Sequence, residues 1–194
     1  MIKPTVSGIV MTNSMSTSTV EKALRRLGEV LVYHCDIEIL IVGGAAGMVT
    51  GVLPATQTTM DCDVMVYDPP EAMTAVESAA DEVATELALA SDWLNSNVQM
   101  RLDALPAGWE QRRISVGSYG RLRVWAASRP DLIAMKVLAG RDQDIEDLQA
   151  MRIRPDDVQF VHEYLDALAD KGTQQEQIDD ARGLLASLEV HDHE

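Results

Sequence analysis

The sequence is poor in cysteine, in aromatic residues and in positive charge. Its 194 residues include two cysteines, one phenylalanine and only 16 lysines and arginines against 31 aspartates and glutamates. Cys35 and Cys62 lie in apolar surroundings without metal-ligand spacing. That pattern argues against a disulfide framework and favours free thiols in a reducing compartment, so we expect a cytoplasmic protein.

The charge balance also limits the class of partner. The formal net charge is -15 at pH 7, so broad electrostatic capture of nucleic acid or of an anionic membrane is not expected. A polyanionic ligand would need a local basic patch or a bridging metal. No apolar run approaches the length of a membrane span, and the N-terminus does not resemble a signal peptide, so we expect no membrane partner.

Length and composition allow one sizeable hydrophobic core, because 46 % of the residues are hydrophobic. No internal repeat or low-complexity linker interrupts the chain. We expect a core domain over residues 1–151 and a C-terminal helical extension over 152–194 that packs on it.

Hydrophobic periodicity predicts helices interleaved with a short mixed sheet, which is an α/β (α+β) fold without a doubly wound repeat. The expected strands are 37–42, 61–67 and 98–105, with a hairpin over 112–128 that turns at residues 118–120. The expected helices are 18–34, 45–53, 73–90, 130–151, 156–170 and 174–188. Ser18 stands three residues before Glu21, which predicts a capping box for the first helix.

Two aspartates, Asp61 and Asp63, stand one residue apart at the start of the strand DCDVMVY. Residues two apart on a strand point to the same side, so the two carboxylates converge. Close anions resist desolvation and favour a divalent cation or a pair of basic side chains as partner, and hard oxygen ligands favour Mg2+ or Mn2+. Asp103, on the polar face of the strand expected at 98–105, is a candidate third ligand in a two-metal site. The alternative is a strand that simply begins at the solvent edge.

A glycine turn precedes this pair. The strand 37–42 ends in Gly43-Gly44 and runs into a helix start, where free backbone N–H groups can bind phosphate. A dinucleotide fingerprint is a rival interpretation. It fails on spacing, because G-x-G-x-x-G ending at Gly47 needs a glycine at Val42.

These motifs resemble a known superfamily. The segment VGGAAG…TTMDCDVMV resembles the nucleotidyltransferase signature, a G-G or G-S turn followed by D-x-D on the next strand. The segments DWLNSNVQMRLDALPAGW and ASRPDLIAMKVLAGRDQDIEDL add matches to a small bacterial branch of uncharacterised proteins. That branch is similar to the AbiEii-like nucleotidyltransferase toxins of toxin–antitoxin systems, and the likeness covers residues 37–151.

The resemblance implies metal-dependent transfer of a nucleoside monophosphate from an NTP to an RNA, such as a tRNA, or to a protein hydroxyl. It also implies a cognate antitoxin as a partner. A catalytically silent nucleotide- or partner-binding module on the same fold is the alternative. The implied residues are Gly43 and Gly44 for the triphosphate, Asp61, Asp63 and Asp103 for metal and catalysis, Lys136 for phosphate, and Arg141, Asp144 and Asp147 as the family's arginine and paired acids.

Independently of the resemblance, Lys136, Gly140, Asp144 and Asp147 share one stripe of the helix expected at 130–151. A solvated face joined by intrahelical ion pairs explains this stripe equally well.

Two positions depart from the family pattern. Ala45 stands where many relatives carry a hydroxyl residue, and Gln57 lies in a loop where an arginine is expected.

The hairpin holds the only basic patch, formed by Arg112, Arg113, Arg121 and Arg123. Such a patch can grip an RNA backbone, pair with an acidic partner, or form a solvated sheet face.

Overall fold

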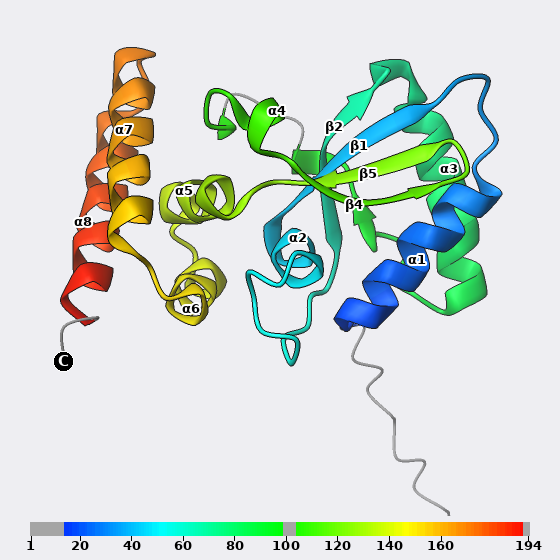
Figure 1. The fold of residues 1–194 in the computed structure, drawn as a ribbon, viewed down its shortest axis with the longest axis horizontal. Coiled ribbons are helices and arrows are strands. Elements are labelled where there is room, and N and C mark those ends of the chain that lie inside the picture. The colour runs from blue at the N-terminus through cyan, green and yellow to red at the C-terminus, as the bar shows by residue number, and fades with distance from the viewer. Residues whose placement is uncertain (1–13, 99–103, 192–194) are drawn as a thin grey trace, which may run out of the picture.

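A computed structural model describes residues 14–98 and 104–191 and shows a five-stranded mixed sheet flanked by helices (Figure 1). The sheet order is β3-β2-β1-β5-β4. Its strands are β1 (Ile37–Val42), β2 (Cys62–Asp68), β3 (Leu94–Asn95), β4 (Ile114–Tyr119) and β5 (Leu122–Ala126). The β1–β2 and β4–β5 pairs are antiparallel, and the β1–β5 and β2–β3 pairs are parallel. This arrangement confirms the expected α/β (α+β) fold class.

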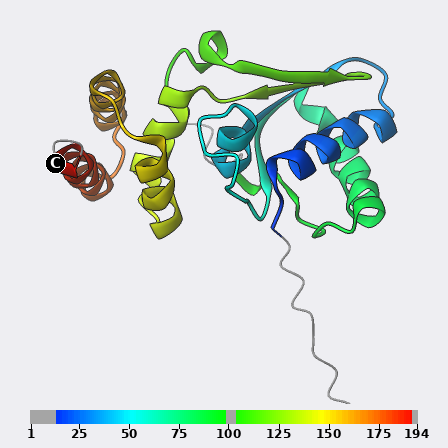
Figure 2. The same cartoon turned by 60° about the horizontal axis from the view of Figure 1, so that its bottom comes forward.

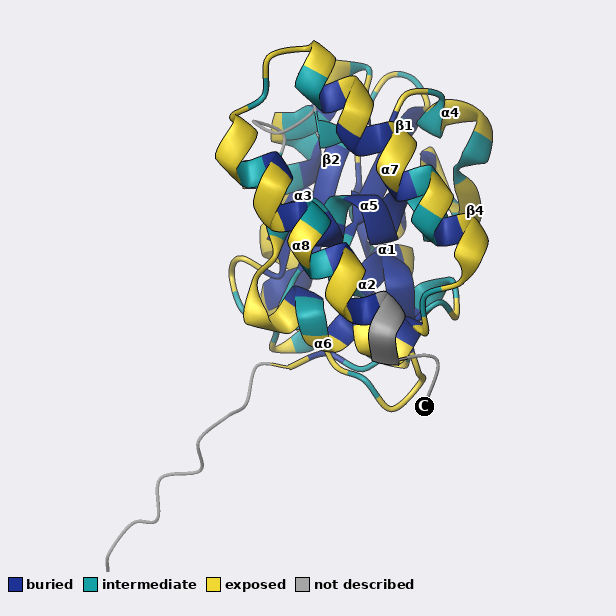
Figure 3. Cartoon of the chain, turned by 90° about the vertical axis from the view of Figure 1, so that its left-hand side faces the viewer, coloured by how far each residue is buried: buried dark blue, intermediate teal, exposed yellow. Residues whose placement is uncertain are grey.

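The helices form two groups on either side of the region where the central strands end. They are α1 (Thr17–Val30), α2 (Gly43–Val49), the 3-10 turn η1 (Pro70–Ala72), α3 (Met73–Leu87), α4 (Trp109–Arg112), α5 (Arg129–Ala139), α6 (Asp142–Met151), α7 (Pro155–Asp170) and α8 (Gln175–His191). Helices α1 and α3 cover one face of the sheet, while α7 and α8 pack against α5 (Figure 2). Figure 3 shows that α7 and α8 turn buried residues inward and exposed residues outward.

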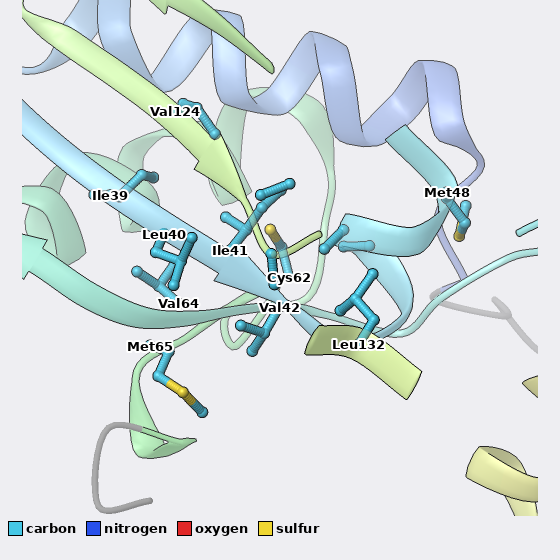
Figure 4. Packing of buried hydrophobic residues seen from close by; sticks show 14 of the residues in the cluster. Ile39, Leu40, Ile41, Val42, Met48, Cys62, Val64, Met65, Val124 and Leu132 are labelled. Carbon is cyan, nitrogen blue, oxygen red and sulfur yellow. The ribbon is translucent and has the colours of Figure 1, made fainter. Parts of the chain in front are cut away.

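Strand β1 anchors the core because both of its faces are apolar apart from Glu38 near its start. Ile37, Ile39 and Ile41 are almost completely buried, and Leu40 and Val42 on the opposite face are buried as well. Figure 4 shows the side chains of residues 39–42 in one cluster with those of β2 and with Leu132 of α5. A strand buried on both faces must lie centrally in the sheet, which brings its C-terminal end to the middle of the molecule.

The helix start predicted at Ser18 is wrong. Helix α1 begins at Thr17, and the side chain of Ser16 accepts a hydrogen bond from the backbone N–H of Thr19 at 3.3 Å. Just before Ser16, Met15 pairs with Thr59 in an isolated β-bridge. The chain leaves that bridge at Ser16, so this serine is the residue placed to cap the helix.

The single helix predicted over 130–151 is also wrong, because the chain breaks it into α5 and α6. Gly140 ends α5 in the left-handed conformation, with φ +59° and its N–H bonded to the carbonyl of Lys136. Glycine adopts this conformation without a Cβ penalty. Apolar residues continue at helical spacing past Gly140, so the hydrophobic periodicity predicts one continuous helix and does not indicate the break. The stripe predicted on one helix is instead a contact between two helices.

The predicted hairpin is confirmed, with its two-residue turn at Gly120-Arg121, slightly later than expected. The strand predicted over 98–105 falls largely on 99–103, outside the described residues. Val98 and Ala104 at its ends are not in a strand, and β3 lies just before it.

The division of the chain at residue 151 stays a prediction. Within the described ranges, no helix combines the length and the apolar character needed to cross a membrane.

Candidate active site

A cleft of about 700 Å³ lies between the edge of β1, β2 and β3 on one side and α5 and α6 on the other. The predicted site residues that the structure describes all line it: Gly43, Gly44, Asp61, Asp63, Lys136, Arg141, Asp144 and Asp147. The remaining one, Asp103, lies outside the described residues. Segments up to about a hundred residues apart in the sequence therefore meet in one cleft, although the role of each residue stays a prediction.

The glycine turn and the carboxylates touch because of the sheet register. Val42, the last residue of β1, pairs with Asp63 of β2. Gly43 follows with φ +68°, and a Cβ atom there would lie 2.7 Å from Asp63 Oδ2. A Cβ atom on Gly44 would lie 3.2 Å from the hydroxyl oxygen of Thr59. The two glycines therefore allow polar side chains to approach the backbone closely.

The predicted alternation along the carboxylate strand is confirmed. Cys62 and Val64 are completely buried in the core, while Asp61 and Asp63 lie half-buried on the side that faces the cleft. Asp61 stands immediately before β2, which begins at Cys62. The tight packing of the inner face leaves the two carboxylates on the outer face together.

The electrostatic environment raises the pKa of both carboxyl groups above the usual aspartate value. Burial raises the pKa of Asp63 to about 6, and the neighbouring Asp61 adds to this effect. A hydrogen bond from Asn95 Nδ2 to Asp63 Oδ1, 2.8 Å long, and the charges of Arg141 and Lys136 oppose it. Burial also raises the pKa of Asp61. The positive charge near the pair is therefore too small to offset the effect of burial on the two pKa values.

The donor atoms of this pair fit a hard divalent cation. Among the described residues, neither Asp61 nor Asp63 forms an ion pair, whereas Asp144 and Asp147 both do. Carboxylate oxygens suit Mg2+ and Mn2+. Within residues 14–98 and 104–191, no group of three His, Cys, Asp or Glu side chains could hold a metal ion. The described part of the chain thus supplies a two-carboxylate site.

Lys136 lies in a buried ion-pair cluster on the opposite wall. Its Nζ donates to Asp147 Oδ2 at 2.5 Å and to Asp144 Oδ1 at 3.1 Å, and all three side chains are almost completely buried. Arg141 Nε donates to Asp144 Oδ2 at 2.7 Å, while 75 % of the Arg141 side chain is exposed at the rim. Burial raises the pKa of Asp144, but hydrogen bonds and the charges of Arg141 and Lys136 outweigh it and lower that pKa. The cluster ties α6 to α5.

Two cleft residues carry contacts that the sequence did not indicate. Gln57, noted only as a missing arginine, donates a hydrogen bond to Asp147 and so joins the loop before β2 to α6. Asn95 contacts Asp63 from the neighbouring strand. The motif DWLNSNVQ contained Asn95, but a lone asparagine has no spacing signal. Ala45, the other departure, is buried in α2.

The arginine patch predicted on the hairpin is largely compensated within the chain, because its four arginines pair with three carboxylates. Arg112 lies 2.5 Å from the buried Asp131, and Arg113 lies 2.8 Å from Glu38. The other pairs are Arg121 with Asp36, and Arg123 with Asp36 and Glu38. The patch therefore keeps little of the positive charge with which proteins hold a phosphate backbone.

Comparison with protein-family models shows where the chain belongs. The model described as "Nucleotidyltransferase of unknown function (DUF6036)" matches residues 19–184. The chain belongs to this nucleotidyltransferase family. Comparisons with curated proteins and with solved structures found no match. Membership confirms the superfamily predicted from the glycine turn and the aspartate pair, and it implies an NTP substrate.

The two close carboxylates of this nucleotidyltransferase should lower its free energy of unfolding when no divalent metal is bound. We expect Asp63→Asn to raise the free energy of unfolding at pH 7, without divalent metal, by about 1–3 kcal/mol, because one pKa unit corresponds to about 1.4 kcal/mol. The pKa of Asp63 is raised from 3.8 to about 6 on folding. The native carboxyl therefore retains its proton longer than the unfolded one, and wild-type stability falls as the pH rises through this window.

Urea denaturation of wild type and Asp63→Asn with a chelator, at pH 4 and at pH 7, measures the gain in the free energy of unfolding. It should be large at pH 7, where the unfolded carboxyl is fully ionised, and small at pH 4, close to the unfolded pKa of 3.8, where the native carboxyl is protonated and the unfolded one is partly protonated. The exposed Asp180 supplies the control Asp180→Asn, which should change stability by less than about 0.5 kcal/mol. An equal gain from Asp63→Asn at both pH values would contradict the raised pKa.

Proposed function

We propose that this protein is a metal-dependent nucleotidyltransferase that moves a nucleoside monophosphate from an NTP to a hydroxyl group of a protein or an RNA. The observation that carries the proposal is the Asp61–Asp63 pair, which faces a cleft of about 700 Å³ without an ion-pair partner among the described residues. A carboxylate pair without a cation on one wall, with the exposed guanidinium of Arg141 at the opposite rim, suits a metal-bound triphosphate.

The roles follow from the positions of the residues. Asp61 and Asp63 would hold Mg2+ or Mn2+, and such an ion would neutralise triphosphate charge and stabilise the leaving pyrophosphate. Gly43 and Gly44 would present backbone N–H groups to phosphate oxygens. Arg141, exposed at the rim, has guanidinium surface left for phosphate.

The reaction joins the acceptor oxygen to the α-phosphorus, breaks the bond from that phosphorus to the bridging oxygen, and releases pyrophosphate. The acceptor hydroxyl must lose its proton to a base. Asp103, implied as the third carboxylate, is the residue that we propose for this proton transfer, and it lies outside the described residues.

The distribution of charge favours a protein acceptor over RNA. The net charge is -15, and the hairpin arginines are paired with Asp36, Glu38 and Asp131. A polyanion would therefore gain little from counterion release at this surface. A toxin role with a cognate antitoxin, similar to AbiEii-like proteins, and a cytoplasmic location belong to the same proposal.

Transfer of label from α-labelled NTPs tests the proposal. Each NTP is offered with Mg2+, total RNA and a protein extract, and we expect label on a protein band with wild type and none with Asp61→Asn. Asp180 on α8 is exposed and does not line the cleft, so Asp180→Asn should label normally. Labelling that persists in Asp61→Asn would contradict the assignment. Magnesium-dependent NTP binding without transfer would favour the silent binding module.

A further inference from the structure

Asn95 lies beside the candidate metal carboxylates and has a fixed orientation. It stands on β3 directly opposite Asp63 in the parallel β2–β3 pair. Its Nδ2 donates to Asp63 Oδ1 at 2.8 Å, and its Oδ1 accepts the backbone N–H of Asn97 at 3.0 Å. Rotation of the amide by 180° would place a carbonyl oxygen against the carboxylate and an NH2 group against an N–H. The donor is therefore held toward Asp63.

The second oxygen of Asp63 is limited from the opposite side. Asp63 Oδ2 approaches Gly43 so closely that a Cβ atom there would lie 2.7 Å away. Asn95 holds Oδ1 and the turn at Gly43 borders Oδ2, so the carboxylate plane is defined by its neighbours. A ligand whose orientation is fixed in advance loses little freedom when it binds an ion.

We infer that Asn95 is a positioning residue that orients Asp63 for a divalent cation without itself ligating the ion. The inference rests on the proposed metal-dependent function. Its side chain presents nitrogen rather than oxygen to the site, so it is not a ligand in this orientation. Outer hydrogen-bond partners of ligating carboxylates tune metal affinity in this way.

The chemical identity of the residue supports this role. A lysine at the position of Asn95 would neutralise Asp63 and compete with the ion, and an aspartate would add a third repulsive charge in the absence of metal. A neutral donor orients the carboxylate while the full charge of Asp61 and Asp63 stays available to a cation.

The backbone of β3 does not depend on this amide. The strand is held by the backbone pairing of Cys62 with Leu94 and of Asp63 with Asn95, and by the hydrogen bond from Cys62 N to Trp93 O at 2.6 Å. Removing the Asn95 side chain should therefore leave the strand in place. The adjacent Ser96, whose hydroxyl lies 2.7 Å from Tyr67 Oη at the same sheet edge, offers a matched control.

Binding of Mn2+ without nucleotide tests the inference independently of activity. Free Mn2+ is measured by electron paramagnetic resonance in titrations of wild type, Asn95→Ala, Asn95→Leu, Ser96→Ala and Asp63→Asn, with circular dichroism to verify folding. Asn95→Leu keeps the shape of the side chain without its donor. We expect both Asn95 variants to bind Mn2+ about 10–100-fold more weakly, and Ser96→Ala to bind as wild type does.

The possible results separate the inference from the proposed function. Wild-type affinity in Asn95→Ala, with affinity lost in Asp63→Asn, overturns the positioning role and leaves the metal site standing. Equal affinity in wild type and Asp63→Asn removes the metal site, and the inference falls with it. Equal weakening in Ser96→Ala, or unfolding of both Asn95 variants, overturns the inference because the edge of the sheet rather than the carboxylate is then affected.

Discussion

Gly28→Ala is expected to destabilise the protein by about 3 kcal/mol, the upper part of the usual cost of overpacking, although alanine is the better helix former. Gly28 lies in α1 against the tip of the hairpin. A Cβ atom there would lie 2.3 Å from the carbonyl oxygen of Tyr119 and 2.4 Å from its Cβ. From the other side, a Cβ atom on Gly120 would lie 2.8 Å from the carbonyl oxygen of Gly28. Two backbones in contact cannot make room by a rotamer change.

Relief of this clash would require α1 to move away from the sheet. Leu24 and Leu27 on the same helix are completely buried, so such a movement would open the core. Urea denaturation of wild type and variant measures the loss.

Gly183→Ala in α8 is the matched control for this substitution. No described atom lies within 4 Å of a Cβ atom at Gly183, so alanine there should gain about 0.5–1 kcal/mol from helix propensity alone. Effects of the same sign in the two variants would contradict the close approach of α1 to the hairpin.

Lys136→Met is expected to destabilise the protein by about 3–5 kcal/mol, the cost of breaking a buried ion pair from one side. Methionine keeps an apolar stem but leaves the buried Asp147 without its cation, while Asp144 keeps the hydrogen bond from Arg141. Urea denaturation measures the loss. The exposed Lys171 supplies the control Lys171→Met, which should stay within about 0.5 kcal/mol of wild type.

The double variant Lys136→Met/Asp147→Asn separates the two roles of the lysine. Removing the unpaired charge should restore much of the stability, because the burial of an uncompensated carboxylate causes the loss. If Lys136 also contacts phosphate, this folded double variant should still fail in NMP transfer. Stability that does not recover in the double variant would contradict the ion-pair explanation.

The sequence was sufficient to predict the elements that are defined by patterns over a few neighbouring residues. The apolar run 37–42 predicts β1, and the hairpin follows from two alternating segments around a glycine turn. The aspartate pair could be assigned to one face because strand geometry alternates, and the structure places Asp61 and Asp63 on that face of the cleft. Family motifs extended this prediction to α5 and α6.

The helix break at Gly140 was the main local feature that the hydrophobic periodicity did not predict. A glycine within an apolar helical pattern is compatible with a continuous helix or with a left-handed cap, and the two differ by packing energy rather than by propensity. In the structure Gly140 adopts the left-handed cap, and α5 packs against α7 and α8. The pairing of Lys136 with Asp144 and Asp147 then arises between helices rather than along one.

The sequence by itself thus determined which residues carry chemistry, because residue type, strand alternation and turn glycines act over a few positions. Only the tertiary structure decided which partners these residues meet. It placed Asn95 beside Asp63, Gln57 beside Asp147, and acids beside the hairpin arginines. The first two of these contacts join segments that are 32 and 90 residues apart. Their geometry depends on sheet register and helix packing, which no local pattern encodes.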